Sequence, residues 1–136
     1  MLTYLYVALG GALGTVARYA IGDWVVRLSG IPAETFPWGT LIINVTGSFV
    51  IGFFAALTSP DEGRWVVGGT GRQFFMTGIC GGYTTFSSFS LQTLNLARDG
   101  EFLRAGGNIV GSVTLCLVAV WLGYTLATAI NLKKGA

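Results

Sequence analysis

The residues best suited to chemistry gather in one short stretch, positions 78–90. Glycine supplies three of these thirteen residues, and serine or threonine supplies five. Glycine costs about 1 kcal/mol relative to alanine inside a helix, and threonine is also a poor helix former. If the stretch crosses a membrane, a break there would leave backbone groups for protein, water or an ion to satisfy. We expect a break from Gly81 to Thr85, with Gly81 needed for its backbone freedom. A straight helix with small residues for close packing is the alternative.

Polar residues elsewhere follow helical spacing. Thr40, Asn44 and Ser48 are four residues apart, so they would form one stripe on a helix. Asn108 and Ser112 repeat the same step. An amide in hydrocarbon is costly without hydrogen-bond partners. The two asparagines therefore indicate either a polar pathway or hydrogen bonds between helices, and both interpretations remain open at this point.

The chemistry available favours a small anion over a cation or a substrate. The sequence has no histidine and only two cysteines, Cys80 and Cys116, which argues against a zinc site, a disulfide framework and most catalytic constellations. No acidic residue lies inside the long uncharged segments, so a carboxylate proton relay is excluded. Hydroxyls and amides are donors, and the electropositive ring edges of Phe86 and Phe89, on one helix face, can also attract an anion.

The distribution of charge defines the elements that must hold these residues. Charged residues make up 10% of the 136 residues, against about 25% in an ordinary soluble domain. The net charge of +2 gives no indication of nucleic-acid binding. Since a membrane-spanning helix needs about 20 apolar residues, we predict one membrane domain over residues 1–136 with four transmembrane helices and no signal peptide. Arg18 is expected near the end of the first helix, with its side chain reaching the interface. The uncharged segments are 1–17, 35–60, 73–97 and 105–132.

The basic residues do not fix the orientation of the chain. With four spans, the two termini and the middle loop share one side of the membrane, and the excess of Lys and Arg should mark the cytoplasmic side. Four basic residues fall on each side: Arg64, Arg72, Lys133 and Lys134 against Arg18, Arg27, Arg98 and Arg104. Either a single loop sets the orientation, or the chain inserts both ways and pairs as an antiparallel dimer.

The order of motifs along the whole chain resembles the Fluc (CrcB-type) fluoride channels. The resemblance rests on residues 10–14 with Arg18 and Tyr19, on residues 36–41 leading to Asn44 and Gly47, and on residues 81–90. It implies an all-α integral membrane protein of a bacterial cell membrane, an antiparallel dual-topology homodimer with four transmembrane helices per subunit. The third helix would be broken, and two pathways would let fluoride leave the cytoplasm passively.

The resemblance also assigns roles to residues. The carbonyls of Gly81 and Thr84 would hold a structural Na⁺ that is not transported. Phe86 and Phe89 would line the fluoride pathways, Asn44 would donate hydrogen bonds there, and Arg18 would organise a vestibule. Ser87, Ser88, Ser112 and Asn108 match polar positions along the route. Two departures are visible: Ser88 stands where threonine is common, and Gln92 stands where an acidic residue is frequent.

Two other function classes are kept as alternatives. A small dual-topology multidrug-type transporter has a similar length, but its proton coupling needs a membrane-embedded glutamate that this sequence lacks. A non-conducting membrane assembly protein would need only glycines for helix packing, which we expect at Gly10, Gly14, Gly107 and Gly111. It would leave the break and both asparagines unexplained.

Overall fold

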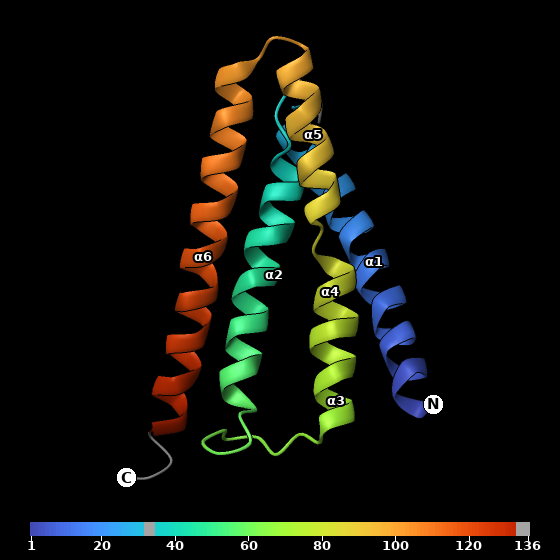
Figure 1. Ribbon diagram of the computed structural model, residues 1–136, viewed down its shortest axis with the longest axis vertical. Coiled ribbons are helices and arrows are strands. Elements are labelled where there is room, and N and C mark those ends of the chain that lie inside the picture. Colours follow the sequence, from blue (N-terminus) through green and yellow to red (C-terminus); the bar gives the residue numbers. More distant parts are fainter. Residues whose placement is uncertain (32–34, 133–136) are drawn as a thin grey trace.

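Within residues 1–31 and 35–132, which the computed structural model describes, every regular element is a helix. The helices form four long segments that lie side by side (Figure 1), and the third segment is divided into several pieces. In chain order the elements are α1 (Leu2–Ser29), α2 (Trp38–Leu57), α3 (Gly69–Gln73), the π-helix η1 (Phe74–Cys80), α4 (Gly81–Tyr83), α5 (Phe86–Arg98) and α6 (Phe102–Leu132).

The predicted four-segment arrangement is confirmed. Helices α1, α2 and α6 are each long and apolar enough to span a bilayer. The third segment runs from α3 to α5 and is bent at its interruption (Figure 1). Helix α1 begins, α6 ends and the α2–α3 loop turns at the same end of the molecule. This agrees with the sequence-based prediction, in which four crossings return the chain to the side where it began.

The first helix is longer than the sequence predicts, which corrects the expected position of Arg18. Helix α1 continues eleven residues beyond Arg18 and ends at Ser29. Asp23 and Arg27 form an ion pair of 2.8 Å one turn apart, so charged residues extend the helix here and do not end it. The end is set by Gly30, whose φ of 63° closes the helix with an N–H bond to the Val26 carbonyl at 3.0 Å.

Two residues used in the sequence analysis, Lys133 and Lys134, lie outside the described part of the chain; they are half of the basic residues on one side. The start of α2 is described: Pro37 precedes its first turn, and Trp38 is half-exposed as expected for an interfacial residue.

Glycines let α1 lie directly against the third segment. A methyl group at Gly10 or Gly14 would overlap backbone atoms, the Phe74 carbonyl in one case and the Ile79 carbonyl in the other. The partner glycine Gly78 lies equally close, because a methyl group there would come within 3.0 Å of the Gly10 Cα. The predicted packing role of Gly10 and Gly14 is therefore confirmed. Helix α1 consequently meets η1, a wide π-helical turn of a kind that often accompanies functional sites.

Within one copy of the chain, the predicted packing role of Gly107 and Gly111 on α6 is not found. A methyl group at Gly107 or Gly111 would meet nothing within 4 Å. Helix α6 instead approaches α2 through Gly123, where a methyl would overlap the Phe49 carbonyl, and through Gly52, where it would overlap the Val120 carbonyl. The contact between these two long helices therefore lies further along α6 than the Gly107–Gly111 pair suggested.

The end of α2 is tied to the segments that follow it. The Arg72 guanidinium donates to the carbonyl and hydroxyl oxygens of Thr58, and at 3.4 Å to the carbonyl of Ala55. Asn131 on α6 donates to the Ala56 carbonyl at 2.9 Å. Carbonyls at a helix C-terminus lack helical donors, so cationic and amide groups are favourable there. These bonds fix the start of the third segment against α2.

Two nearby glycines of α1 give a test of this packing. We expect Gly14→Ala to lower the melting temperature of the detergent-solubilised protein, because α1 and the third segment must move apart, at a cost of about 1–3 kcal/mol. Gly11→Ala is the matched control, since its methyl group would meet nothing within 4 Å. Thermal unfolding of both variants checks the prediction, and equal melting temperatures would contradict it.

Candidate functional site

The interruption of the third segment is two residues long. Helix α4 ends at Tyr83, Thr84 and Thr85 are extended with ψ of 158° and 110°, and α5 begins at Phe86. The predicted break is thus present and narrower than expected. Gly81 is helical, with φ −65° and ψ −38°, and a methyl group there would come no closer than 3.8 Å to other atoms. The expected need for glycine backbone freedom at Gly81 is therefore wrong.

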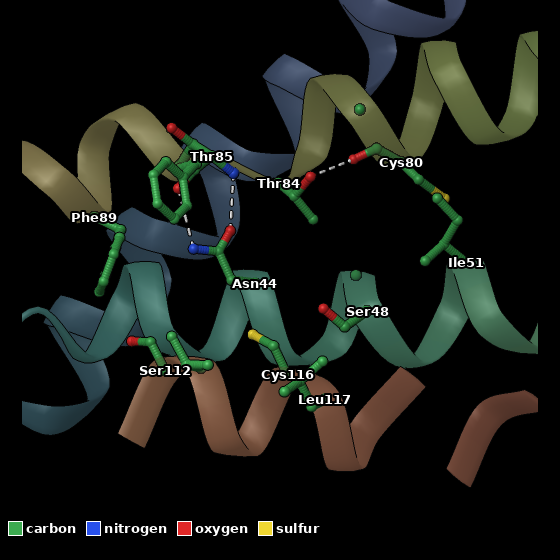
Figure 2. A pocket seen from close by; sticks show the side chains of 14 residues that line it. Asn44, Ser48, Ile51, Cys80, Thr84, Thr85, Phe89, Ser112, Cys116 and Leu117 are labelled. Atoms are coloured by element: carbon green, nitrogen blue, oxygen red, sulfur yellow. Dashed lines mark hydrogen bonds between the residues drawn. The ribbon is translucent and has the colours of Figure 1, made fainter. Parts of the chain in front are cut away.

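Asn44 of α2 takes over the hydrogen bonding that the break removes from the third segment. Its Nδ2 donates to the Thr85 carbonyl at 3.0 Å, and the Thr85 N–H donates to its Oδ1 at 2.8 Å. Figure 2 draws both bonds. In an unbroken helix the Thr85 N–H would donate to the Gly81 carbonyl. Asn44 therefore holds the extended backbone and releases that carbonyl, and one Nδ2 hydrogen of its amide remains for another acceptor.

Thr84 is held by its side chain as well as its backbone. Its methyl group lies where a side chain at Gly47 would be, so Gly47 forms a notch in α2 for it. The Thr84 hydroxyl and N–H both donate to the Cys80 carbonyl, each at 2.9 Å. The Tyr83 hydroxyl lies 2.9 Å from the Thr46 hydroxyl of α2. Helix α2 thus contacts the break through a single turn, from Asn44 to Gly47.

Thr85 caps α5 and also joins three hydroxyl groups. Its Oγ1 accepts the Ser88 N–H at 3.1 Å, which is the usual N-cap bond. The same hydroxyl donates to Ser88 Oγ at 3.0 Å and lies 3.2 Å from Ser87 Oγ. Sequence reasoning missed this role, although Thr85 and Ser88 have the three-residue spacing of an N-cap.

A cavity of about 370 Å³ lies against the break, and we call it the break cavity. Figure 2 shows that its walls come from α2, α6 and the third segment. It brings together seven residues that the sequence places at the break or on the pathway: Asn44, Gly81, Thr84, Thr85, Phe86, Phe89 and Ser112. The predicted site residues of three separate helices therefore meet in one place.

Phe86 and Phe89 lie together at this cavity in different environments. Their ring centroids are 5.2 Å apart with an interplanar angle of 48°. Phe89 is 8% exposed and Phe86 is 76% exposed. One ring is therefore packed in the fold, whereas the other faces outward with its surface available.

A second cavity, of about 470 Å³, lies between α1, α2 and α5, and we call it the α1–α5 cavity. Arg18, Thr40, Ser88 and Gln92 line it. Arg18 thus lies mid-helix and still faces a polar hollow, where the resemblance implies a vestibule. Within the described part of the chain, Gln92 Oε1 is a buried oxygen without a hydrogen-bond partner. Ser87 lines neither cavity.

Asn108 is placed differently from the other predicted pathway residues. It is 1% exposed and lines neither cavity. Its Nδ2 donates to Thr93 Oγ1 of α5 at 2.8 Å, and its Oδ1 accepts from Ser112 Oγ at 3.2 Å. In this structure Asn108 joins α5 to α6, as the alternative interpretation has it, and reaches the break cavity only through Ser112.

Replacing Asn44 tests whether it holds the break. In Asn44→Leu, the Thr85 N–H and carbonyl lose their partners, at about 1–3 kcal/mol for each buried group left unpaired. We expect lower thermal stability and faster hydrogen–deuterium exchange at the Thr85 amide. Ser48→Ala is the control, because Ser48 lines the same cavity one turn further along α2. Unchanged exchange at Thr85 in Asn44→Leu would show that the bonds to Asn44 do not hold the break.

Comparison with known proteins gives the family of the chain. The family model described as "CrcB-like protein, Camphor Resistance (CrcB)" matches residues 5–124. A protein of Opitutus terrae named "Fluoride-specific ion channel FluC" is 65% identical over 136 residues, which is 100% of both chains. Proteins of the same name from Methylocella silvestris and Paramagnetospirillum magneticum are 59% identical over 133 residues and 61% identical over 131 residues. These alignments cover 98% of both chains in the first case, and 96% of this chain and 99% of the relative in the second. The chain therefore belongs to the CrcB family, whose curated relatives here carry the name FluC.

Proposed function

We propose that this chain is a fluoride-specific ion channel that lets fluoride leave the bacterial cytoplasm passively. The observation that carries the proposal is 65% identity, over the full length of both chains, to a protein named as such a channel. The geometry of the break agrees with it. A cavity at a helix interruption, lined by donors and aromatic rings, is a typical place for an ion inside a membrane protein.

The proposal gives the break cavity a specific task. Fluoride holds its hydration water tightly, so a selective pathway must replace several water contacts with close donors. The free Nδ2 hydrogen of Asn44, the Ser112 hydroxyl and the ring edges of Phe86 and Phe89 are the groups available at this cavity. Since Ser112 Oγ–H donates to Asn108 in this structure, it must turn away from that bond to contact an anion.

A second copy and a sodium ion complete the proposed site. The Gly81 carbonyl has lost the Thr85 N–H to Asn44, and the Ser88 N–H bonds to the Thr85 hydroxyl instead of continuing the helical ladder to Thr84. Two carbonyls at the break are therefore available, and oxygen ligands suit a hard cation. In an antiparallel dual-topology homodimer the partner would add the same pair, and the Na⁺ they held would be structural and would attract anions to both pathways.

The aromatic residues test the proposed pathway. We expect Phe86→Ile and Phe89→Ile each to lower fluoride efflux from liposomes at least tenfold, measured with a fluoride electrode. Each tenfold loss corresponds to about 1.4 kcal/mol at the barrier, which lost contacts between the ring edges and the ion can supply.

The control for the aromatic variants is Phe102→Ile, which removes an exposed ring at the first residue of α6. It should leave efflux unchanged. Rates are compared per folded protein, determined by gel filtration, because Phe89 is buried and its loss also affects packing. Near-normal efflux in both well-folded variants would place the pathway elsewhere.

The dual orientation has its own test. Two lysines added before Met1 should bias insertion toward one orientation, since basic residues near span ends set the topology. We expect efflux to be lost and to return when this variant is coexpressed with one that carries Asp99→Lys and Glu101→Lys, which bias the opposite end. Orientation is measured by labelling from one side of the membrane. Full efflux from a population with one orientation would exclude the antiparallel dimer.

A further inference from the structure

Thr85 occupies a position that no other described residue shares. The break cavity and the α1–α5 cavity have one lining residue in common, and that residue is Thr85. Phe86, Phe89 and Ser112 lie on one side of it, whereas Arg18 and Ser88 lie on the other. With an exposure of 8%, Thr85 is itself buried between the two hollows. It therefore forms part of the wall that separates them.

The backbone of Thr85 is fixed, but its hydroxyl proton is free to choose a partner. Asn44 bonds both the N–H and the carbonyl of Thr85, so the residue cannot shift along the segment without breaking two bonds. The hydroxyl oxygen has neighbours on both serines, Ser87 at 3.2 Å and Ser88 at 3.0 Å. A hydroxyl rotates to suit its surroundings, since it carries one donor and two acceptor lone pairs.

Proton arithmetic shows what this cluster can offer to an anion. The hydroxyls of Thr85, Ser87 and Ser88 carry three protons, and the two oxygen–oxygen contacts use two of them. When Thr85 donates to Ser88, as in this structure, the Ser88 proton is free and Ser88 lines the α1–α5 cavity. When Ser88 instead donates its hydroxyl proton to Thr85, the N–H and O–H of Ser88 fill both lone pairs of Thr85 Oγ1, and the Ser87 hydroxyl turns to another acceptor. The Thr85 proton is then free, and Thr85 also lines the break cavity. Rotation of hydroxyls alone thus moves the free donor from one cavity to the other.

We propose that Thr85 is the contact through which the transported anion passes between the α1–α5 cavity and the break cavity. The proposal rests on the proposed channel function and adds a residue to it. Asp23 also lines the α1–α5 cavity, but Arg27 pairs with its carboxylate at 2.8 Å, which leaves the charge of Arg18 to attract the anion there. Ser88 meets the anion in that cavity, and the Thr85 hydroxyl receives it on the way to Phe86 and Phe89. The Ser88 N–H bond to Thr85 Oγ1 persists throughout, because it uses a lone pair of the oxygen.

A purely structural role of Thr85 as the cap of α5 makes different predictions. An N-cap needs an acceptor for the Ser88 N–H, and aspartate meets this need as well as threonine does. An anion pathway needs a donor, and a carboxylate repels the ion. Thr85→Asp therefore keeps the cap and removes the contact, whereas Thr85→Val keeps the shape and removes both.

The experiment measures fluoride efflux and thermal stability for the same set of proteins. We expect Thr85→Ser to lie within twofold of the parent efflux, and Thr85→Val and Thr85→Asp to fall at least tenfold. The melting temperature of each variant shows whether its loss of efflux reflects unfolding. Thr125→Val is the matched control, because it removes a threonine hydroxyl that bonds only within α6, and it should leave efflux unchanged.

A cysteine variant covers the case in which the valine or aspartate variant does not fold. Thr85→Cys is made in a chain with Cys80→Ala and Cys116→Ala, and it is treated with a small water-soluble methanethiosulfonate. We expect modification to block efflux, and fluoride to slow the modification. Parent-like efflux in folded Thr85→Asp, or after complete modification of Thr85→Cys, would overturn the proposal for Thr85. If the parent protein itself showed no fluoride efflux, the result would instead overturn the channel function.

Discussion

The structure depends on one requirement of the bilayer: every backbone N–H and carbonyl at membrane depth needs a partner. A helix meets this requirement by itself, and a broken helix does not. Here the partner comes from α2, where one asparagine amide replaces the missing helical bonds of Thr85. Because that amide bonds both backbone groups of one residue, the interruption stays two residues long and the helices on either side remain intact.

The packing around the break follows from the same requirement. The asparagine reaches Thr85 only if α2 lies close to the third segment, and Gly47 provides the space by leaving room for the Thr84 methyl. Helix α1 closes in from another side through Gly10 and Gly14. Small residues thus appear where backbones must approach, and polar residues appear where the backbone is interrupted. The cavity at the break is what remains between these contacts and α6.

Sequence reasoning predicted the elements well and their connections poorly. Uncharged segments predicted four crossings because charge is excluded from hydrocarbon, but they misplaced the end of α1, since an ion pair one turn apart is compatible with a continuing helix. The spacing of Gly10 and Gly14 predicted a close approach. Gly52 and Gly123 were missed because they lie on different helices and form no local pattern. The pairing of Asn44 with Thr85 spans 41 residues, so no local spacing could reveal it. The N-cap role of Thr85 could have been predicted from a threonine placed directly before a helical segment. It was missed because the neighbouring glycines directed attention to the break.

The reliance of the third segment on Asn44 also constrains how the protein is made. Chains enter the membrane from the N-terminus onward, so α2 is synthesised before the segment that needs its asparagine. When Thr85 emerges, 41 residues later, its partner is already available in the bilayer. A third segment inserted far from α2 would expose its interrupted backbone to lipid, which is costly. The order of the helices along the chain thus lets biosynthesis deliver the broken helix directly to the surface that stabilises it.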